Sequence, residues 1–326
     1  MRMPAEWEPH TRTWMSWPPS GYIEGDDAES DRARAAWAAV ALAVARFEPV
    51  TMLVDPADEA YARAALGDAV EIMVVPLDDS WMRDNGPTFV HTADGLAGVD
   101  WVFNGWGAQD WATWDKDAQV ARLICANTGV PAISSPMVNE GGGIHVDGAG
   151  TVLVTRTVQL GQGRNPDWTQ EQVEAELART LGVDRVIWIE RGLTRDYEQF
   201  GTRGHIDIVA CFTPDGAVLV HDQRNPEHPD HEVTAEVMAV MREAGLTVIP
   251  LPAPDVLRDE HGWVDYSYIN HYVCNGAVIL CAFDDPGDER AKTILADVYP
   301  GREIVLVDAR AIFARGGGIH CITQQQ

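Results

Sequence analysis

A cysteine in a glycine-rich segment is the first candidate for chemistry. Cys321 lies in the sequence Gly-Gly-Gly-Ile-His-Cys-Ile-Thr, which covers residues 316–323. Glycines carry no side chain, so a ligand can approach the backbone closely there. A thiolate in such a place is a nucleophile, whereas a buried thiol packs as a small apolar group. If residues 319–322 form a strand, Cys321 and His320 point to opposite faces, and His320 is not the base for Cys321.

A histidine and an aspartate two residues apart are the second candidate. His205 and Asp207 stand at the start of a predicted strand over 206–212, and a period of two places them on one face. A neighbouring carboxylate raises the basicity of an imidazole and fixes its position, as acid/base catalysis near neutral pH requires. The same pattern also occurs in structural pairs and as metal ligands, so the pair alone does not choose between these roles.

A polar segment between two predicted strands supplies further carboxylates. Residues 78–87 read Asp-Asp-Ser-Trp-Met-Arg-Asp-Asn-Gly-Pro, and turn formation alone explains the part from Asp84 onward. Its three carboxylates beside Trp81 also suit a planar cation, because carboxylates accept paired N–H bonds and an indole stacks on the cation's face. Glu140, directly before the glycines at 141–143, adds another carboxylate or is a solvated loop residue.

Other motifs indicate less. His221, His228 and His231, with nearby aspartates, resemble a metal cluster, but their spacing suits a loop and a helix cap better than zinc. A metallohydrolase built on the ten histidines would lose its activity with a chelator. The segment Gly-Gln-Gly-Arg at 161–164 lacks the third glycine of a dinucleotide fingerprint.

Composition excludes several classes of protein. The 326 residues include 24 Lys and Arg against 50 Asp and Glu, a net charge of −26, and 46% are hydrophobic. Such a chain has a large core and is a poor ligand for nucleic acid or an anionic membrane. The charge attracts small cations, although solubility explains it equally well. Five cysteines without a Cys-x-x-Cys pair, and no signal-like or spanning apolar stretch, predict a reduced cytoplasmic enzyme with no membrane span.

Helical and strand patterns alternate along the chain, and no low-complexity linker divides it. Thr169 and Gln172 form a capping-box pattern, and Gly-Gly-Gly-Ile-His occurs twice, at 141–145 and 316–320, as expected of a repeated unit. The patterns predict helices over 31–47, 116–128, 169–181, 231–244 and 288–298. They predict strands over 50–54, 70–75, 88–91, 97–103, 151–155, 186–189, 206–212, 217–220, 247–251, 267–274, 277–283 and 303–307.

Several stretches together resemble the agmatine deiminase family, a branch of the guanidino-modifying pentein superfamily that is peptidyl-arginine-deiminase-like. They are MPAEWEPHTRTWMSWP, DDSWMRDNGPTF, DWVFNGWG, EGGGIHVDGAGTVLVT, GRNP, GHID and GGGIHCITQQ, in the family's order over essentially the whole chain. The resemblance implies an α/β fold: a five-bladed propeller of ββαβ units around a central pocket, in one domain over 1–326. It also implies no metal or organic cofactor, and a homo-oligomer, dimer or higher.

The resemblance assigns roles residue by residue. It makes Cys321 the nucleophile and His205 the general acid/base, with Asp84 and Asp207 holding the guanidinium nitrogens. Glu140 would orient His205, and Trp81 would flank the guanidinium or the aliphatic arm. The implied reaction converts agmatine, a small cationic guanidino compound, to N-carbamoylputrescine and ammonia through an amidino-thioether on Cys321.

The chain departs from the family pattern around the substrate's distal end. Arg203 replaces the usual Asn before Gly-His-x-Asp, residues 195–201 differ from a shorter acidic segment, and Gly143 and Gly318 replace Ser and Asn. Arg203 and Gly318 are expected at the substrate wall, where an arginine would favour a carboxylate-bearing substrate such as arginine over agmatine. The alternatives are an amidinotransferase, in which an amine replaces water, and a catalytically silent pentein that serves as a binding protein.

Overall fold

The computed structural model describes residues 1–21 and 27–326, and within them one strand–helix unit recurs. In its clearest copy, β4 (Thr88–Thr92) pairs antiparallel with β5 (Gly95–Val102). Helix α5 (Val120–Thr128) then leads to β6 (Ala132–Val138), which pairs parallel with β5. The unit is therefore ββαβ, and its helix makes the crossover that two parallel strands need.

Three further units repeat this order, with an antiparallel pair first and a parallel pair second. They are β7 (Ile144–Val146), β8 (Thr151–Thr155), α7 (Gln170–Leu181) and β9 (Arg185–Ile189); β10 (Ala210–Phe212), β11 (Val218–Asp222), α8 (Asp230–Glu243) and β12 (Val248–Pro252); and β15 (Tyr272–Cys274), β16 (Ala277–Ala282), α9 (Gly287–Val298) and β17 (Glu303–Asp308).

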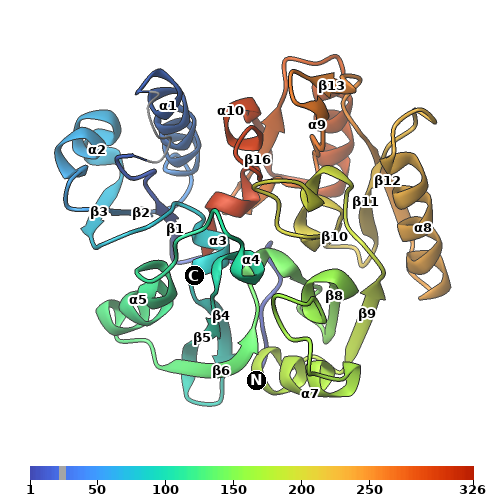
Figure 1. The fold of residues 1–326 in the computed structure, drawn as a ribbon, viewed down its shortest axis with the longest axis horizontal. Helices are drawn as coiled ribbons and strands as arrows, with labels where there is room; N and C mark the ends of the chain where they lie inside the picture. The colour runs from blue at the N-terminus through green and yellow to red at the C-terminus, as the bar shows by residue number, and fades with distance from the viewer. Residues whose placement is uncertain (22–26) are drawn as a thin grey trace.

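A fifth sheet joins segments from the two ends of the sequence. Strand β18 (Gln324–Gln325) pairs antiparallel with β1 (Thr13–Ser16), and α1 (Asp27–Val44) leads to β2 (Val50–Val54), parallel to β1. Helix α2 (Glu59–Leu66) and strand β3 (Glu71–Val74) extend this sheet. Figure 1 shows the five sheets following one another around the middle of the molecule, with α1, α2, α5, α7, α8 and α9 on the outside.

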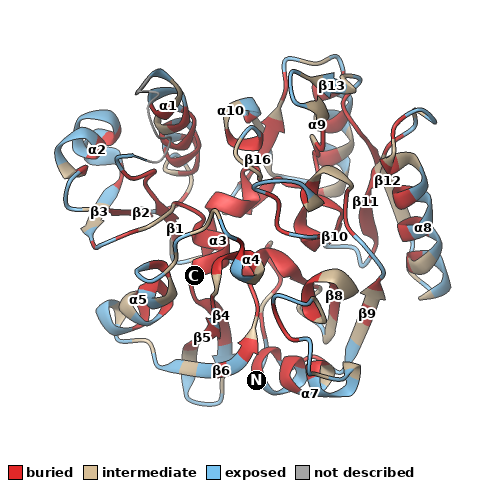
Figure 2. Ribbon diagram, viewed as in Figure 1, coloured by how far each residue is buried: buried red, intermediate tan, exposed pale blue. Residues whose placement is uncertain are grey.

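Short elements fill the connections and the middle of the molecule. They are η1 (Gly67–Ala69), α3 (Met82–Asn85), α4 (Gly105–Ala108), η2 (Asp117–Gln119), η3 (Gly141–Gly143), α6 (Arg156–Gln159), η4 (Arg195–Tyr197), η5 (Ile206–Ile208), β13 (Arg258–Asp259), β14 (Gly262–Trp263), α10 (Arg310–Phe313) and η6 (His320–Ile322). Figure 2 shows that the inner strands and the inner faces of the helices are buried, while the outer helix faces and much of strands β3 and β6 are exposed. No helix in the described part of the chain is long and apolar enough to span a membrane.

The expected helices are present, and α7 shows why. The Thr169 hydroxyl accepts from the Gln172 backbone N–H, the Gln172 side chain binds back to Thr169, and Gly182 ends the helix in the left-handed region. This capping box satisfies N–H groups that have no partner inside the helix. Helix α2 and strands β1, β6 and β7 were not predicted. The runs of α2, β1 and β7 are short, and the apolar pattern of β6 is interrupted by two serines and a proline at 134–136.

The strand predicted over 206–212 is correct only for 210–212, and the strand considered for 319–322 does not form. Residues 206–208 form the turn η5 rather than the start of a strand, because the preceding N–H groups of Gly204 and His205 donate to the Asp196 side chain and not to a neighbouring strand. Residues 320–322 form the turn η6, since the His320 N–H donates to the Asn270 side chain. The argument that placed His320 and Cys321 on opposite faces of a strand therefore does not apply.

Candidate active site

Four short turns in the middle of the molecule carry the candidate residues. Asp84 lies in α3, Glu140 directly precedes η3, His205 and Asp207 lie at η5, and Cys321 lies in η6. These turns touch one another, α3 against η3 and η6, and η3 against η5. The side chains come from distant parts of the sequence, and each residue is at most 3% exposed.

Gly142 shows how tightly the candidate side chains converge. A methyl group added to Gly142 would lie 2.4 Å from His205 Nδ1 and 3.0 Å from both Asp207 Oδ2 and Asp84 Oδ1. Its backbone N–H donates to Asp84 Oδ1 at 3.1 Å. Only glycine fits where two carboxylates and an imidazole meet.

The Cys321 thiol lies between an amide and a carboxylate. Asn270 Nδ2 donates to Cys321 Sγ at 3.2 Å, and the thiol donates to Asp207 Oδ2 at 3.4 Å. Burial, together with the charges of Asp207 and Asp84, raises the pKa of Cys321 well above its usual value. The resting group is therefore a thiol, and a cation must arrive before a thiolate is favoured.

His205 is held as a cation by the carboxylates around it. Its Nε2 is 3.3 Å from Glu140 Oε2, and its Nδ1 is 3.8 Å from Asp84 Oδ1 with no hydrogen-bond partner among the described residues. Burial lowers the pKa of His205, but Asp84, Glu140 and Asp207 outweigh burial and raise it to about 9. An imidazolium at neutral pH can give a proton to a leaving group.

The two aspartates have different environments. Asp84 Oδ2 accepts from Trp106 Nε1 at 2.8 Å, yet burial and the nearby Asp207 and Glu140 raise the pKa of Asp84 to about 6. Burial also acts to raise the pKa of Asp207, but the 2.8 Å bond to His320 Nδ1 and the nearby positive charges of His320, His205 and Arg83 together outweigh it and lower that pKa. Asp207 Oδ1 has no hydrogen-bond partner among the described residues, so this oxygen is available to a ligand.

Glu140 is fixed from behind by an arginine that was not predicted to take part. Arg164 Nε donates to Glu140 Oε2 at 2.9 Å, and Arg164 Nη2 donates to the Thr202 carbonyl at 2.7 Å. Both side chains are at most 2% exposed. Burial raises the pKa of Glu140, but Arg164 and His205 outweigh burial and lower it, so Glu140 is an anion facing His205.

The loop before His205 is organised by Asp196, which was also not predicted. Its carboxylate accepts the backbone N–H groups of Thr202 at 2.6 Å, of Gly204 at 2.6 Å and of His205 at 3.2 Å. Gly204 has a φ of 115°, which favours glycine. This network fixes the position of the imidazole.

Trp81 links the buried cluster to a cavity of about 930 Å³. Trp81, Trp111 and Phe200 line this cavity with Asp78 and Asp79. A methyl group added to Gly317 would lie 2.7 Å from Trp81 Cζ3 and 3.0 Å from Cys321 Sγ. The indole and the thiol therefore both lie against Gly317, which brings the cavity wall at Trp81 close to Cys321.

Arg203 and Gly318 lie apart from that cavity wall. Arg203 donates to the Tyr197 carbonyl at 2.8 Å and to Gln109 Oε1 at 3.1 Å, and it lines a separate cavity of about 1110 Å³. Trp111 lines both cavities. Gly318 packs against Asn270, because an added methyl would lie 2.4 Å from Asn270 Oδ1.

Of the histidines at 221, 228 and 231, only His228 accepts an N–H at the start of α8, while His221 lies in strand β11 and His231 in the first turn of the helix. The Asp230 N–H at the start of α8 donates to His228 Nδ1 at 3.1 Å, and His228 Nε2 is 3.0 Å from the Val264 carbonyl. Within residues 1–21 and 27–326, no group of three or more His, Cys, Asp or Glu side chains has an arrangement that could hold a metal ion.

Comparison with known proteins gives this geometry a family. The model of the Porphyromonas-type peptidyl-arginine deiminase family matches residues 2–326. The chain belongs to this family. It is thus an enzyme of the deiminase class, a hydrolase of C–N bonds in amidines, and the resemblance predicted from the sequence is confirmed.

Relatives cover the chain from end to end. A putative agmatine deiminase of Streptomyces coelicolor is 58% identical over 100% of this chain and 98% of its own length. The agmatine deiminase of Stutzerimonas stutzeri is 41% identical over 99% and 95%. The solved agmatine deiminase of Enterococcus faecalis has a TM-score of 0.91 and 31% identity over 100% of this chain and 95% of its own. The predicted mixed α/β fold is confirmed.

Proposed function

We propose that this deiminase hydrolyses agmatine to N-carbamoylputrescine and ammonia, with Cys321 as the nucleophile. The observation that carries the proposal is the convergence of His205, Asp84 and Asp207 around Gly142. The Cys321 thiol joins this buried cluster through Asp207 Oδ2 at 3.4 Å, next to Trp81. It is supported by full-length relatives that bear the name agmatine deiminase. We further infer that the five ββαβ units are the blades of one propeller domain over 1–326, with the site in its central pocket.

Substrate binding supplies the charge that the resting site lacks. Asp84 and Asp207 hold the guanidinium nitrogens, with Asp207 Oδ1 free to accept them, and Trp81 flanks the planar group. The positive guanidinium next to Cys321 stabilises the thiolate, which burial and the two carboxylates otherwise disfavour. The thiol proton passes to solvent as the cation arrives, and it is the proton that the departing ammonia takes up in water.

The first chemical step forms a covalent intermediate. The Cys321 thiolate attacks the guanidinium carbon, and a C–S bond forms. His205, an imidazolium, gives its proton to the departing nitrogen, the C–N bond breaks, and ammonia leaves. An S-alkyl thiouronium on Cys321 and a neutral imidazole remain, and Glu140 keeps the imidazole in place.

The second step reverses the roles of the same groups. Neutral His205 takes a proton from water as the water oxygen attacks the thiouronium carbon. The tetrahedral intermediate collapses, the C–S bond breaks, and its O–H proton passes to the Cys321 sulfur. The neutral ureido product leaves, Cys321 is a thiol again, and His205 is protonated. Water supplies the oxygen atom, and His205 carries the proton in both steps.

The cavity wall around Trp81 favours a cationic distal end. Asp78 and Asp79 line it beside the indole, and their carboxylates suit the ammonium group of agmatine. Arg310 lines the same cavity, so a carboxylate-bearing guanidino compound such as arginine is the competing substrate.

Ammonia release and intact mass test the proposal with agmatine and arginine. Wild type should release ammonia and accumulate an amidino adduct on rapid acid quench, Cys321→Ser should do neither, and Cys125→Ser, a buried cysteine outside the cluster, should behave as wild type. The faster substrate decides between agmatine and arginine. An added amine that appears in the product would indicate amidino transfer. Adduct and ammonia from Cys321→Ser would refute the nucleophile, and silence of wild type with both substrates would refute the function.

A further inference from the structure

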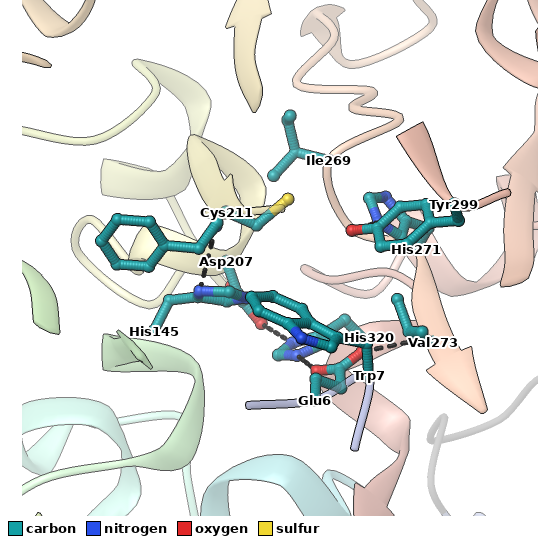
Figure 3. Close-up of a pocket in the computed structure, with 11 residues that line it drawn as sticks. Glu6, Trp7, His145, Asp207, Cys211, Ile269, His271, Val273, Tyr299 and His320 are labelled. Atoms are coloured by element: carbon teal, nitrogen blue, oxygen red, sulfur yellow. Dashed lines mark hydrogen bonds and ion pairs between the residues drawn. The ribbon is translucent and has the colours of Figure 1, made fainter. Parts of the chain in front are cut away.

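Three buried ionisable side chains form a hydrogen-bonded series that ends next to the nucleophile. His320 Nδ1 is 2.8 Å from Asp207 Oδ2, and His320 Nε2 is 2.8 Å from Glu6 Oε2. Figure 3 shows Glu6, His320 and Asp207 in line, with the two carboxylates on opposite sides of the imidazole. Glu6 is held by the Val273 backbone N–H at 2.7 Å. All three side chains are at least nine-tenths buried.

We propose that His320 and Glu6 are positioning residues for the deimination, because they fix the Asp207 carboxylate with Oδ2 engaged and Oδ1 turned to the substrate. This inference rests on the proposed function. Asp207 Oδ2 accepts from both His320 and Cys321, whereas Oδ1 has no hydrogen-bond partner in the described part of the chain. A carboxylate held by one oxygen presents the other in a fixed direction, as a guanidinium ligand must.

The charges of these buried groups balance, which explains why the deeply buried Asp207 carboxylate stays ionised. Two cations, His320 and Arg83, alternate with two anions, Asp207 and Glu6, and Arg83 Nη2 lies 3.7 Å from Glu6 Oε2. Burial and Arg83 lower the pKa of His320, but Glu6 and Asp207 outweigh them and raise it. Buried ions need such pairing, and removal of one member leaves its neighbour uncompensated.

The described residues leave little room for water beside these contacts. The cavity next to these three side chains measures about 10 Å³ and is lined by Glu6, Trp7, Asp207 and His320, among other residues. A cavity of that size holds one water molecule at most. The orientation of Asp207 therefore depends on its bonds to His320 and Cys321 rather than on a solvent shell.

The repeated motif supplies a matched control. His145, in the first Gly-Gly-Gly-Ile-His copy, is equally buried, and its ring centre lies 6.5 Å from that of His320. Its Nδ1 accepts the Phe212 N–H at 3.3 Å and makes no contact with Asp207. Burial lowers the pKa of His145 to about 3, although Glu6 opposes the shift. One repeat histidine is thus neutral and structural, while the other is charged and faces the site.

The first test compares His320→Gln with His145→Gln. The charged or titratable neighbours of Asp207 are His320, His205, Arg83, Asp84 and Cys321; those of His320 are Glu6, Asp207, Arg83, His145 and His271. Loss of His320 removes a cation from Asp207, so kcat/KM should fall roughly 10- to 100-fold near neutral pH. The acidic limb of the kcat/KM–pH profile should move up by about 1–3 pH units. KM should be raised at low pH and should recover as the pH rises. His145→Gln should leave this limb in place.

A uniform loss of activity in His320→Gln with an unmoved acidic limb would overturn the proposal, as would an equal shift in His145→Gln. Glu6→Gln keeps a hydrogen-bond acceptor for His320 and should give a smaller shift in the same direction. Nitrogen NMR of labelled histidines needs no activity: His320 should carry protons on both ring nitrogens at pH 7, and a neutral His320 would refute the proposal. If wild type has no deiminase activity but His320 is doubly protonated, the proposed function is refuted, whereas the ion pairing of His320 with Glu6 and Asp207 is supported.

Discussion

Replacement of Asp84 by Asn tests the electrostatics of the site most directly. Asn keeps the size of the side chain and can accept the 2.8 Å bond from Trp106, but it removes the negative charge. The His205 Nδ1–Asp84 Oδ1 distance is 3.8 Å. At an effective dielectric constant of about 20, a charge pair at roughly 4 Å contributes about 4 kcal/mol, which corresponds to about 3 pKa units.

The expected result is a large fall in the pKa of His205. In wild type, Asp84 contributes most among the groups that raise this pKa to about 9 against burial. In Asp84→Asn, burial is opposed by Glu140 and Asp207 alone, so the pKa should fall by up to about 3 units. The fraction of His205 able to protonate a leaving group at pH 8 falls with it, and the basic limb of kcat/KM should move to lower pH.

Histidine NMR in the free enzyme measures this pKa, with the His205 signal assigned by its loss in His205→Gln. Asp100→Asn is the matched control, because Asp100 is a buried aspartate whose ion pair with Arg122 lies outside the cluster. It should leave the pKa of His205 near 9. An unchanged His205 pKa in Asp84→Asn would refute the argument that Asp84 keeps the imidazole charged.

Three further changes should be measurable. Trp106→Phe removes the N–H that binds Asp84, and kcat/KM should fall roughly 10- to 100-fold, since a hydrogen bond to a charged group contributes about 1.5–3 kcal/mol; unchanged kinetics would contradict this role. Arg203→Asn should leave the kcat/KM ratio of agmatine to arginine unchanged, because Arg203 lines a cavity separate from the one at Trp81; a shift toward agmatine would show that Arg203 reaches the substrate. Chemical denaturation should show the free energy of unfolding falling from pH 6.5 to 9, and a stability that does not fall would contradict it. The fall follows from His205, whose folded pKa of about 9 lies above its unfolded value, so that the folded state binds the extra proton over this range.

The regular elements could be predicted because their signals are local. Helix α7 begins at a capping box and ends at a glycine, and the strands around it are β-branched runs, so pattern and propensity agree. The turns that hold the site could not be predicted in this way. Residues 206–208 and 320–322 have apolar, strand-like sequences. However, the side chains of Asp196 and Asn270, which come from other segments of the chain, accept backbone N–H groups that a strand would use. Tertiary contacts override local propensity there.

The candidate residues were predicted by type and motif, whereas the groups that support them were not. Arg164 stands in the quoted Gly-Arg-Asn-Pro segment, yet nothing in that segment indicates a buried ion pair with Glu140. Asn270 has no motif, and its contact with Cys321 arises from the packing of η6. Such contacts form only when segments far apart in the sequence have packed together, so a single sequence carries only weak signals for them.

The two copies of Gly-Gly-Gly-Ile-His illustrate the same limit on a finer scale. Their sequences are identical over five residues, and both histidines are buried near the middle of the molecule. The first copy continues into strand β7, where His145 meets a backbone N–H and stays neutral. The second turns into η6, where His320 meets two carboxylates and keeps its charge. The sequence repeat therefore predicts the position of each imidazole, while the carboxylates contributed by Glu6 and Asp207 decide its charge and, with it, its use.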